Sequence, residues 1–370
     1  MPPNADQIEV TLLGPGYGEC AVIHLGNGHW VVIDSCLDSD TGQPAALSYL
    51  ESLGVDPETA VKLVLATHWH DDHICGMGSL VSRCVGAKFC CSSALGTSDF
   101  QGMVLQYEAG SIITGGSGVR EINKVTSTLL GRNDHPVAAN ANRLVLRLPA
   151  AETVHGKECR VWTLSPSDAQ YQKFLYEITA LMPQVKKTKR RCVAQSRNML
   201  SVVTWVMIGD LAILLGGDLE ETGDDATGWS VIVASAERPG GRAAIFKVPH
   251  HGSENAHSDG VWTDMLVEQP FAILAPWNRG KRKRPSTDDV GRIVERTQKA
   301  YSTARLKLAR ARERPKPVQK TLKEHGIDVR PVEPRTGILR LRNGGLDDFQ
   351  AWEVELLRGA CPLSQIHTAA

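Results

Sequence analysis

The sequence predicts an α/β protein, because short apolar runs typical of buried strands alternate with segments of helical periodicity. Residues 61–66 are β-branched and apolar, the pattern of a buried strand. Residues 43–53 repeat apolar side chains at helical spacing and are followed by Gly54, a residue that commonly ends helices. Residues 200–208 and 211–215 form a predicted hairpin across Gly209-Asp210.

The other expected elements continue this alternation. Short strands and Gly-rich turns open the chain, and residues 92–136, rich in Gly, Ser and Thr, permit no assignment. Expected strands are 10–13, 21–25, 29–33, 144–148, 160–164, 243–248 and 271–275. Expected helices are 171–181, 290–297 and a basic helix over 304–314. With no internal repeat, we predict one domain over residues 1–370, with a basic helical segment at 279–325 and a C-terminal hairpin at 337–357.

Composition identifies an ordinary globular chain. It is 42% hydrophobic and 22% charged with zero formal net charge, so the total charge indicates no class of partner. The nine cysteines show no zinc-finger spacing, and we interpret them as mostly reduced, buried thiols. The N-terminus lacks a signal pattern and no apolar run approaches 18 residues, so we expect a cytoplasmic protein without membrane contact.

The most informative motif is His68-Trp69-His70-Asp71-Asp72-His73, directly after the strand at 61–66. Imidazole nitrogens and carboxylate oxygens suit Zn²⁺, Mn²⁺ or Fe²⁺. A purely structural role is the alternative, because His is common at helix starts and Asp caps helices. Three His and two Asp within six residues, in a chain of 12 His, favour a metal site instead.

This motif resembles the His-x-His-x-Asp-His hallmark of the metallo-β-lactamase superfamily, and further motifs follow in the order of that superfamily. Asp34 follows an early strand, Asp218 follows the predicted hairpin, and His250-His251 follow the strand at 243–248. The sequence Lys-Val-Pro-His-His-Gly-Ser at 247–253 resembles that of the ComEC-type (competence) branch. This chain would be a stand-alone soluble relative of that branch. The resemblance implies a four-layer αββα sandwich with two divalent metal ions, Zn or Mn, at one edge.

The resemblance also implies individual roles. His68 and His70 would hold the first metal, and Asp72 and His73 the second. Asp218 would bridge both metals, Asp34 would orient ligands, and either His250 or His251 would complete the second site. Hydroxide generated on the metals would attack the substrate, with Asp72 or Asp218 taking the proton.

One departure concerns the first metal position. Many superfamily members carry another His ligand between the hallmark and the bridging Asp, but residues 196–199 read Ser-Arg-Asn-Met. His155 lies earlier and is interpreted as a turn residue. We therefore expect the first position to be the weaker one, with water or Asn198 completing it.

Local charge favours a phosphodiester substrate. Basic runs occupy 186–191, 279–284 and 305–316, and between residues 278 and 325 there are 16 Lys or Arg against 5 Asp or Glu. Such a surface can steer a polyanion, although charge runs are often merely solvated. Predicted substrate contacts are Asn198, Ser253, Lys187, Arg190 and Arg191.

Three hypotheses remain. The first is a metal-dependent phosphodiesterase or nuclease acting on DNA or RNA. The second is a hydrolase of a small ester, thioester or lactone, for which the basic runs would be incidental. The third is a nucleic-acid-binding or partner-binding module with a structural metal site, against which the intact hallmark and Asp218 argue.

Overall fold

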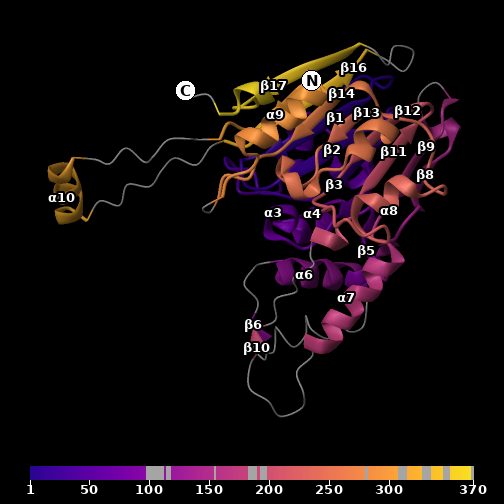
Figure 1. Cartoon of the computed structure of the whole chain (residues 1–370), viewed down its shortest axis with the longest axis horizontal. Helices are drawn as coiled ribbons and strands as arrows, with labels where there is room; N and C mark the ends of the chain where they lie inside the picture. Colours follow the sequence, from indigo (N-terminus) through magenta and orange to yellow (C-terminus); the bar gives the residue numbers. More distant parts are fainter. Residues whose placement is uncertain are drawn as a thin grey trace.

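The computed structural model describes residues 1–96, 112–113, 118–153, 156–181, 190–191, 198–279, 282–306, 315–326, 335–344 and 351–367. Two large mixed sheets dominate the architecture, with helices on their outer faces (Figure 1). The first sheet has the order β17-β16-β1-β2-β3-β4-β5-β7, and the second β18-β15-β14-β13-β12-β11-β9-β8. A short parallel pair joins β6 to β10.

The strand bounds are as follows. The first sheet contains β1 (Glu9–Gly14), β2 (Cys20–His24), β3 (Trp30–Ile33), β4 (Val61–Ala66), β5 (Lys88–Ser92), β7 (Val137–Ala139), β16 (Gly337–Asn343) and β17 (Trp352–Leu357). The second contains β8 (Arg143–Leu148), β9 (Cys159–Thr163), β11 (Thr204–Ile208), β12 (Leu211–Leu215), β13 (Ala243–Lys247), β14 (Leu266–Leu274), β15 (Ala300–Ser302) and β18 (Cys361–Pro362). The small pair is β6 (Ile112–Ile113) with β10 (Arg190–Arg191).

The helices are mostly short. They are α1 (Ala45–Ser52), α2 (Pro57–Ala60), α3 (Asp71–Ile74), α4 (Met77–Arg83), α6 (Gly118–Gly131), α7 (Asp168–Leu181), α8 (Gly228–Ala234), α9 (Thr287–Arg296) and α10 (Lys316–Glu324). Among the described residues, no helix combines the length and the apolar character needed to cross a membrane.

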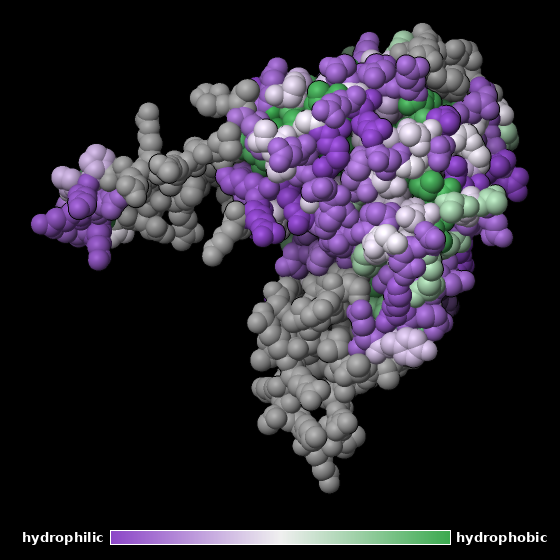
Figure 2. Space-filling view, viewed as in Figure 1, coloured by the Kyte–Doolittle hydropathy of each residue, from purple (hydrophilic) through white to green (hydrophobic). Residues whose placement is uncertain are grey.

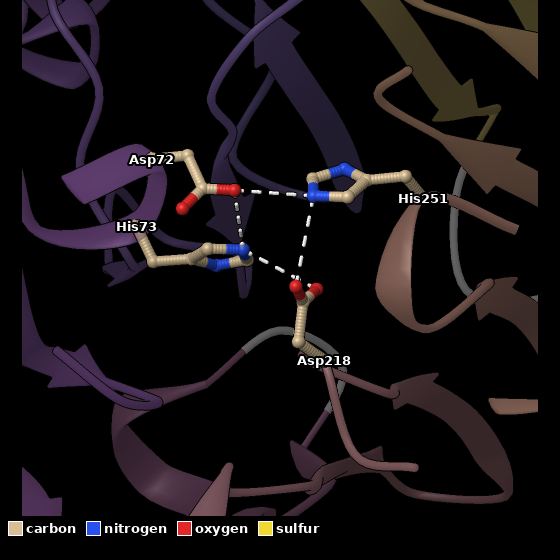
Figure 3. A group of neighbouring side chains, drawn as sticks. All are labelled: Asp72, His73, Asp218 and His251. Carbon is tan, nitrogen blue, oxygen red and sulfur yellow. Dashed lines mark hydrogen bonds and ion pairs between the residues drawn. The ribbon is translucent and has the colours of Figure 1, made fainter. Parts of the chain in front are cut away.

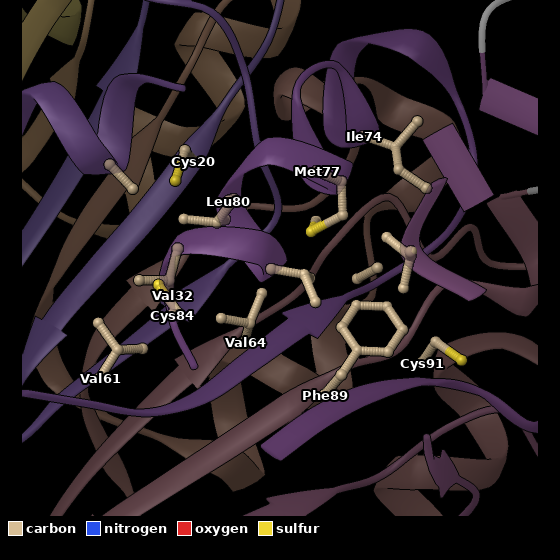
Figure 4. Close-up of a cluster of buried hydrophobic side chains, with 14 of the residues drawn as sticks. Cys20, Val32, Val61, Val64, Ile74, Met77, Leu80, Cys84, Phe89 and Cys91 are labelled. Atoms are coloured by element: carbon tan, nitrogen blue, oxygen red, sulfur yellow. The ribbon is translucent and has the colours of Figure 1, made fainter. Parts of the chain in front are cut away.

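Successive side chains along a strand point to opposite faces of the sheet, and this alternation creates three apolar layers. In β12, Ile213 and Leu215 pack between the two sheets, whereas Leu214 faces the helices outside the second sheet. Leu63 of β4 likewise faces the inter-sheet core, whereas Val64 packs with Leu80 of α4 in the core outside the first sheet (Figure 4). The two outer cores and one inner core produce the predicted four-layer αββα arrangement.

The sequence-based expectations hold for most elements, with two corrections. The strand predicted from Leu200 begins only at Thr204, because Leu200 ends a short 3₁₀ turn. The helix predicted from residue 304 is wrong for 304–306, where Ala304 and Leu306 are buried in non-helical chain and the Leu306 N–H bonds the Ile366 carbonyl at 3.0 Å. Its remainder, 307–314, lies outside the described residues, and a basic helix follows as α10.

Candidate metal centre

Strand ends from both sheets deliver the polar residues of the site to one edge of the sandwich. The hallmark loop follows β4, and Asp34 follows the neighbouring parallel strand β3. Asp218 follows β12, and His250-His251 follow its parallel neighbour β13. Because parallel strands end at a common edge, motifs far apart in sequence converge here.

Asp72, His73, Asp218 and His251 form one compact cluster (Figure 3). Asp72 and His73 enter from α3 on one side, and Asp218 and His251 enter from loops of the second sheet on the other. Their ligand atoms all lie within 4.8 Å of one another, and three of the four residues are buried.

The spacing of these atoms fits a cation. His73 Nε2 lies 3.2 Å from Asp218 Oδ1 and 3.5 Å from Asp72 Oδ2. His251 Nε2 lies 3.1 Å from Asp72 Oδ2 and 3.6 Å from Asp218 Oδ2. Ligands about 2.1 Å from a tetrahedral ion are about 3.4 Å apart, so the observed separations match such a shell.

Two buried atoms of the cluster reinforce this fit. Within the described part of the chain, His73 Nε2 and Asp218 Oδ1 have no hydrogen-bond partner of good geometry. Buried polar atoms without partners are costly, and a bound cation would satisfy both. The donor set of two imidazoles and two carboxylates suits Zn²⁺ or Mn²⁺.

Electrostatics keeps the carboxylates of the cluster ionised. Burial favours the protonated acid, but His73 and His251 outweigh it and hold the pKa of Asp72 below its usual range. The same two imidazoles, with Lys247, hold the pKa of Asp218 well below its usual range against burial. Burial lowers the pKa of His73 and His251, yet the surrounding carboxylates raise both overall.

Asp34 lies behind His73 and fixes its ring. Its Oδ2 accepts from His73 Nδ1 at 2.7 Å and from the Thr67 hydroxyl at 2.8 Å, while Oδ1 accepts from the Thr67 N–H at 2.7 Å. With Nδ1 occupied in this way, Nε2 of His73 is directed at the cluster. The resemblance implies that Asp34 orients a ligand in this way, and that role stays a prediction.

The turn after β13 separates the two adjacent histidines. His250 and His251 both adopt left-handed conformations, with φ of 47° and 55°. Such backbone is unusual for residues other than glycine and is concentrated at functional sites. The turn directs His251 into the cluster, where its Nδ1 lies 2.9 Å from the Ala275 carbonyl oxygen. The sequence left open which of the two is the ligand, and the structure brings His251 to the other three.

His250 lies beside the cluster among other polar side chains. Its Nδ1 lies 3.0 Å from Asn255 Oδ1, and its Nε2 lies 3.3 Å from Asn198 Nδ2 and contacts Arg284. Asn198 Nδ2 also donates to Glu220 at 2.8 Å. Burial lowers the pKa of His250 to about 4, and Arg284 adds to this effect.

His68 and His70 are close to each other, with His68 Nε2 3.0 Å from His70 Nδ1. Burial lowers the pKa of His68 well below its usual value, and the neighbouring imidazoles of His73 and His70 add to this effect. In the described ranges, however, they join no group of three or more metal-ligating side chains. The expectation that the first position is the weaker one stays a prediction.

Within the described residues, the structure does not bring the remaining predicted substrate contacts to the cluster. Ser253 lines a separate small pocket with Trp229 and Ile293. Arg190 and Arg191 form β10, but their side chains, Lys187 and His155 lie outside the description. Contacts of these residues with a substrate stay predictions.

Sequence reasoning missed two buried charges behind the cluster. Glu19 precedes β2 and forms an ion pair with Lys247, the last residue of β13. A glutamate in a Gly-rich turn carried no signal of burial. Lys247 belonged to the motif at 247–253 but was given no role.

One family model and several solved structures match parts of the chain. The model of the metallo-beta-lactamase superfamily matches residues 13–157, which contain Asp34 and the His68–His73 motif. No curated protein matches the chain. The metallo-beta-lactamase fold protein YhfI from Bacillus subtilis is 13% identical, covering 73% of this chain and 85% of that one, with a TM-score of 0.34. A candidate metallo-beta-lactamase from Thermotoga maritima is 15% identical, covering 55% and 68%, with a TM-score of 0.30.

The family model matches less than half of the chain, and the two mixed sheets flanked by helices are consistent with an αββα metallo-beta-lactamase sandwich fold. The narrower ComEC-type branch stays a prediction.

Proposed function

We propose that this protein is a metal-dependent phosphodiesterase that acts on nucleic acid. The observation that supports the proposal best is the adjacency of a buried His/Asp cluster and a basic rim. The cluster would hold the metal, and the rim would hold the phosphate backbone.

The metal would be held by Asp72, His73, Asp218 and His251. When bound, a divalent ion lowers the pKa of water and neutralises charge that develops on a phosphoryl oxygen. Asp34 keeps His73 in the tautomer that presents Nε2, through the 2.7 Å bond to Nδ1. The Ser201 hydroxyl accepts from the Asp218 N–H at 2.9 Å and fixes the start of the Asp218 turn.

The basic rim consists of the described residues Arg279, Arg282, Lys283 and Arg284. Arg279, Arg282 and Lys283 are exposed, and Arg284 reaches inward to His250. The N–H and carbonyl of Trp277 pair with those of Arg284 at 2.9 Å, so the two ends of this segment are held together. The Trp277 ring lies 5.7 Å from the ring of His251, which places the segment beside the cluster.

A second loop reinforces this wall. The Asn278 N–H bonds the Gly16 carbonyl at 2.7 Å, and the Arg279 guanidinium lies over the Tyr17 ring at 3.4 Å from its centre. Much of the surface seen in Figure 2 is hydrophilic. Exposed cations beside a site that would hold a divalent cation suit a substrate with several phosphates better than a neutral ester.

The test is a substrate panel on protein loaded with Zn²⁺ or Mn²⁺. It contains single- and double-stranded DNA and RNA, bis(p-nitrophenyl) phosphate and p-nitrophenyl acetate. We expect cleavage of nucleic acid and of the small phosphodiester. Turnover of the acetate ester without cleavage of any phosphodiester would overturn the proposal. His135→Ala, which changes an exposed ring outside the cluster, serves as the matched control for variants of the cluster histidines.

Three further variants test the assignment of residues. His251→Ala should weaken metal binding, whereas His250→Ala should retain it, as measured by calorimetric titration with Zn²⁺.

Replacing Arg282, Lys283 and Arg284 by Gln should weaken nucleic-acid binding and reduce the slope of log affinity against log salt by about 2 to 3. An unchanged slope would remove the rim from the proposal.

A further inference from the structure

A buried ion pair lies directly behind the candidate metal cluster. The side chains of Glu19 and Lys247 are only 4% and 3% exposed, and their charged groups are in contact. Lys247 Nζ donates to the Gly217 carbonyl at 2.7 Å and lies 3.8 Å from Asp218 Oδ1. Lys247 therefore touches both the Asp218 carboxylate and the turn that presents it.

That turn has no room for a side chain at Gly217. Gly217 has a φ of +51°, and a Cβ at this position would lie 2.4 Å from Ser201 Oγ. The hydrogen bond from Lys247 is therefore made to a turn that requires glycine. Lys247 contacts this turn through its hydrogen bond and places its positive charge beside the Asp218 carboxylate.

Glu19 reaches the outer nitrogens of both ligand imidazoles. Its Oε1 lies 3.6 Å from His73 Nδ1, and its Oε2 lies 3.9 Å from His251 Nδ1. Over the described ranges, Oε2 has no hydrogen-bond partner. The pair as a whole therefore adjoins three of the four ligands.

A buried ion pair is a weak source of stability, because desolvation of two charges offsets much of their attraction. Near a metal site, however, each charge has a direct effect. The Glu19 carboxylate attracts a divalent cation and the Lys247 ammonium repels it. At this depth neither charge is screened well by water or salt.

We propose that Glu19 and Lys247 form a charge-balancing pair that sets the affinity of the Asp72/His73/Asp218/His251 cluster for a divalent cation. The inference rests on the proposed metal-dependent function. Neither residue is assigned as a metal ligand, since their charges act on the cation from behind the ligands that they contact.

The test compares Glu19→Gln, Lys247→Met and the double variant by calorimetric titration with Zn²⁺ and, separately, with Mn²⁺. Glu19→Gln keeps the shape of the side chain but leaves the ammonium unbalanced, so metal affinity should fall by about tenfold or more. Lys247→Met removes the repelling charge and should leave affinity unchanged or raise it. The double variant should return to within a few-fold of the original protein.

This pattern separates charge balance from a purely structural role. If the pair only supported the local fold, both single variants would bind metal more weakly and the double variant would be no better than either. That result would overturn the inference, as would unchanged affinity in Glu19→Gln. Should Lys247→Met fail to fold, Glu19→Gln and the double variant still decide the matter, because replacing both charges with neutral groups is often tolerated.

A matched control is available in β1 of the first sheet. Glu9 is another fully buried glutamate, paired with Arg342, and it contacts Tyr49 and Thr11 instead of the metal cluster. Glu9→Gln should change stability without changing metal affinity. If the original protein binds neither Zn²⁺ nor Mn²⁺, the proposed function itself fails, whereas normal binding by Glu19→Gln refutes only the role of the pair.

Discussion

The buried imidazole of His24 should make the protein less stable in mild acid. His24 is the last residue of β2, its ring is 1% exposed, and it lies away from the metal cluster. Nδ1 lies 2.9 Å from the Gln7 carbonyl oxygen, and Nε2 accepts from the Gly28 N–H at 3.0 Å. The ring is therefore neutral, and a proton on Nε2 would oppose the Gly28 N–H.

The magnitude follows from the shift in pKa. Burial lowers the pKa of His24 from 6.5 to about 4. Because the unfolded chain then binds more protons than the folded one, the free energy of unfolding falls as pH drops below 6.5 and levels off below 4. Linkage gives a loss of about 2 kcal/mol between pH 7 and pH 5, and about 3.4 kcal/mol at full protonation.

Urea denaturation of metal-free protein at pH 7 and pH 5 measures this loss, with tryptophan fluorescence as the probe. His24→Gln has no imidazole to protonate at this position. Between pH 7 and pH 5 its free energy of unfolding should therefore decrease by about 2 kcal/mol less than that of the original protein. His135→Gln, at an exposed position, is the control. An equal loss in His24→Gln and the original protein would refute the reasoning.

Two further predictions concern the ligand support and the core. Asp34→Asn should weaken Zn²⁺ binding by about 10- to 100-fold, because His73 loses the carboxylate that fixes its ring; unchanged affinity in a titration would contradict this role. Leu80→Ala should lower the free energy of unfolding by about 2 to 5 kcal/mol, since the side chain is fully buried in the core outside the first sheet. Leu130→Ala in α6, where the side chain is 67% exposed, should change it little, and similar losses in both variants would argue against this packing.

Local patterns were sufficient for most elements. The strand at 61–66 and the hairpin of β11 and β12 could be predicted because their apolar residues and turns are contiguous in sequence. The boundary at Leu200 could not, because Ser201 is held by the Asp218 N–H, a contact 17 residues away. Likewise, residues 304–306 remain non-helical because of a bond to Ile366, near the C-terminus.

For the site, the sequence by itself determined the residue types and their order. The hallmark at 68–73, Asp34, Asp218 and the His250-His251 pair were all visible as motifs. Only the tertiary structure decided which histidine of the pair joins Asp72, His73 and Asp218. The reason is a turn in which both residues take positive φ and their rings diverge.

The tertiary structure alone also revealed the Glu19–Lys247 pair. These residues are 228 positions apart, one before a strand of the first sheet and the other ending a strand of the second. Neither position marks burial in the sequence, because charged side chains are normally exposed. Their contact exists only because the two sheets meet at this edge, behind the metal ligands.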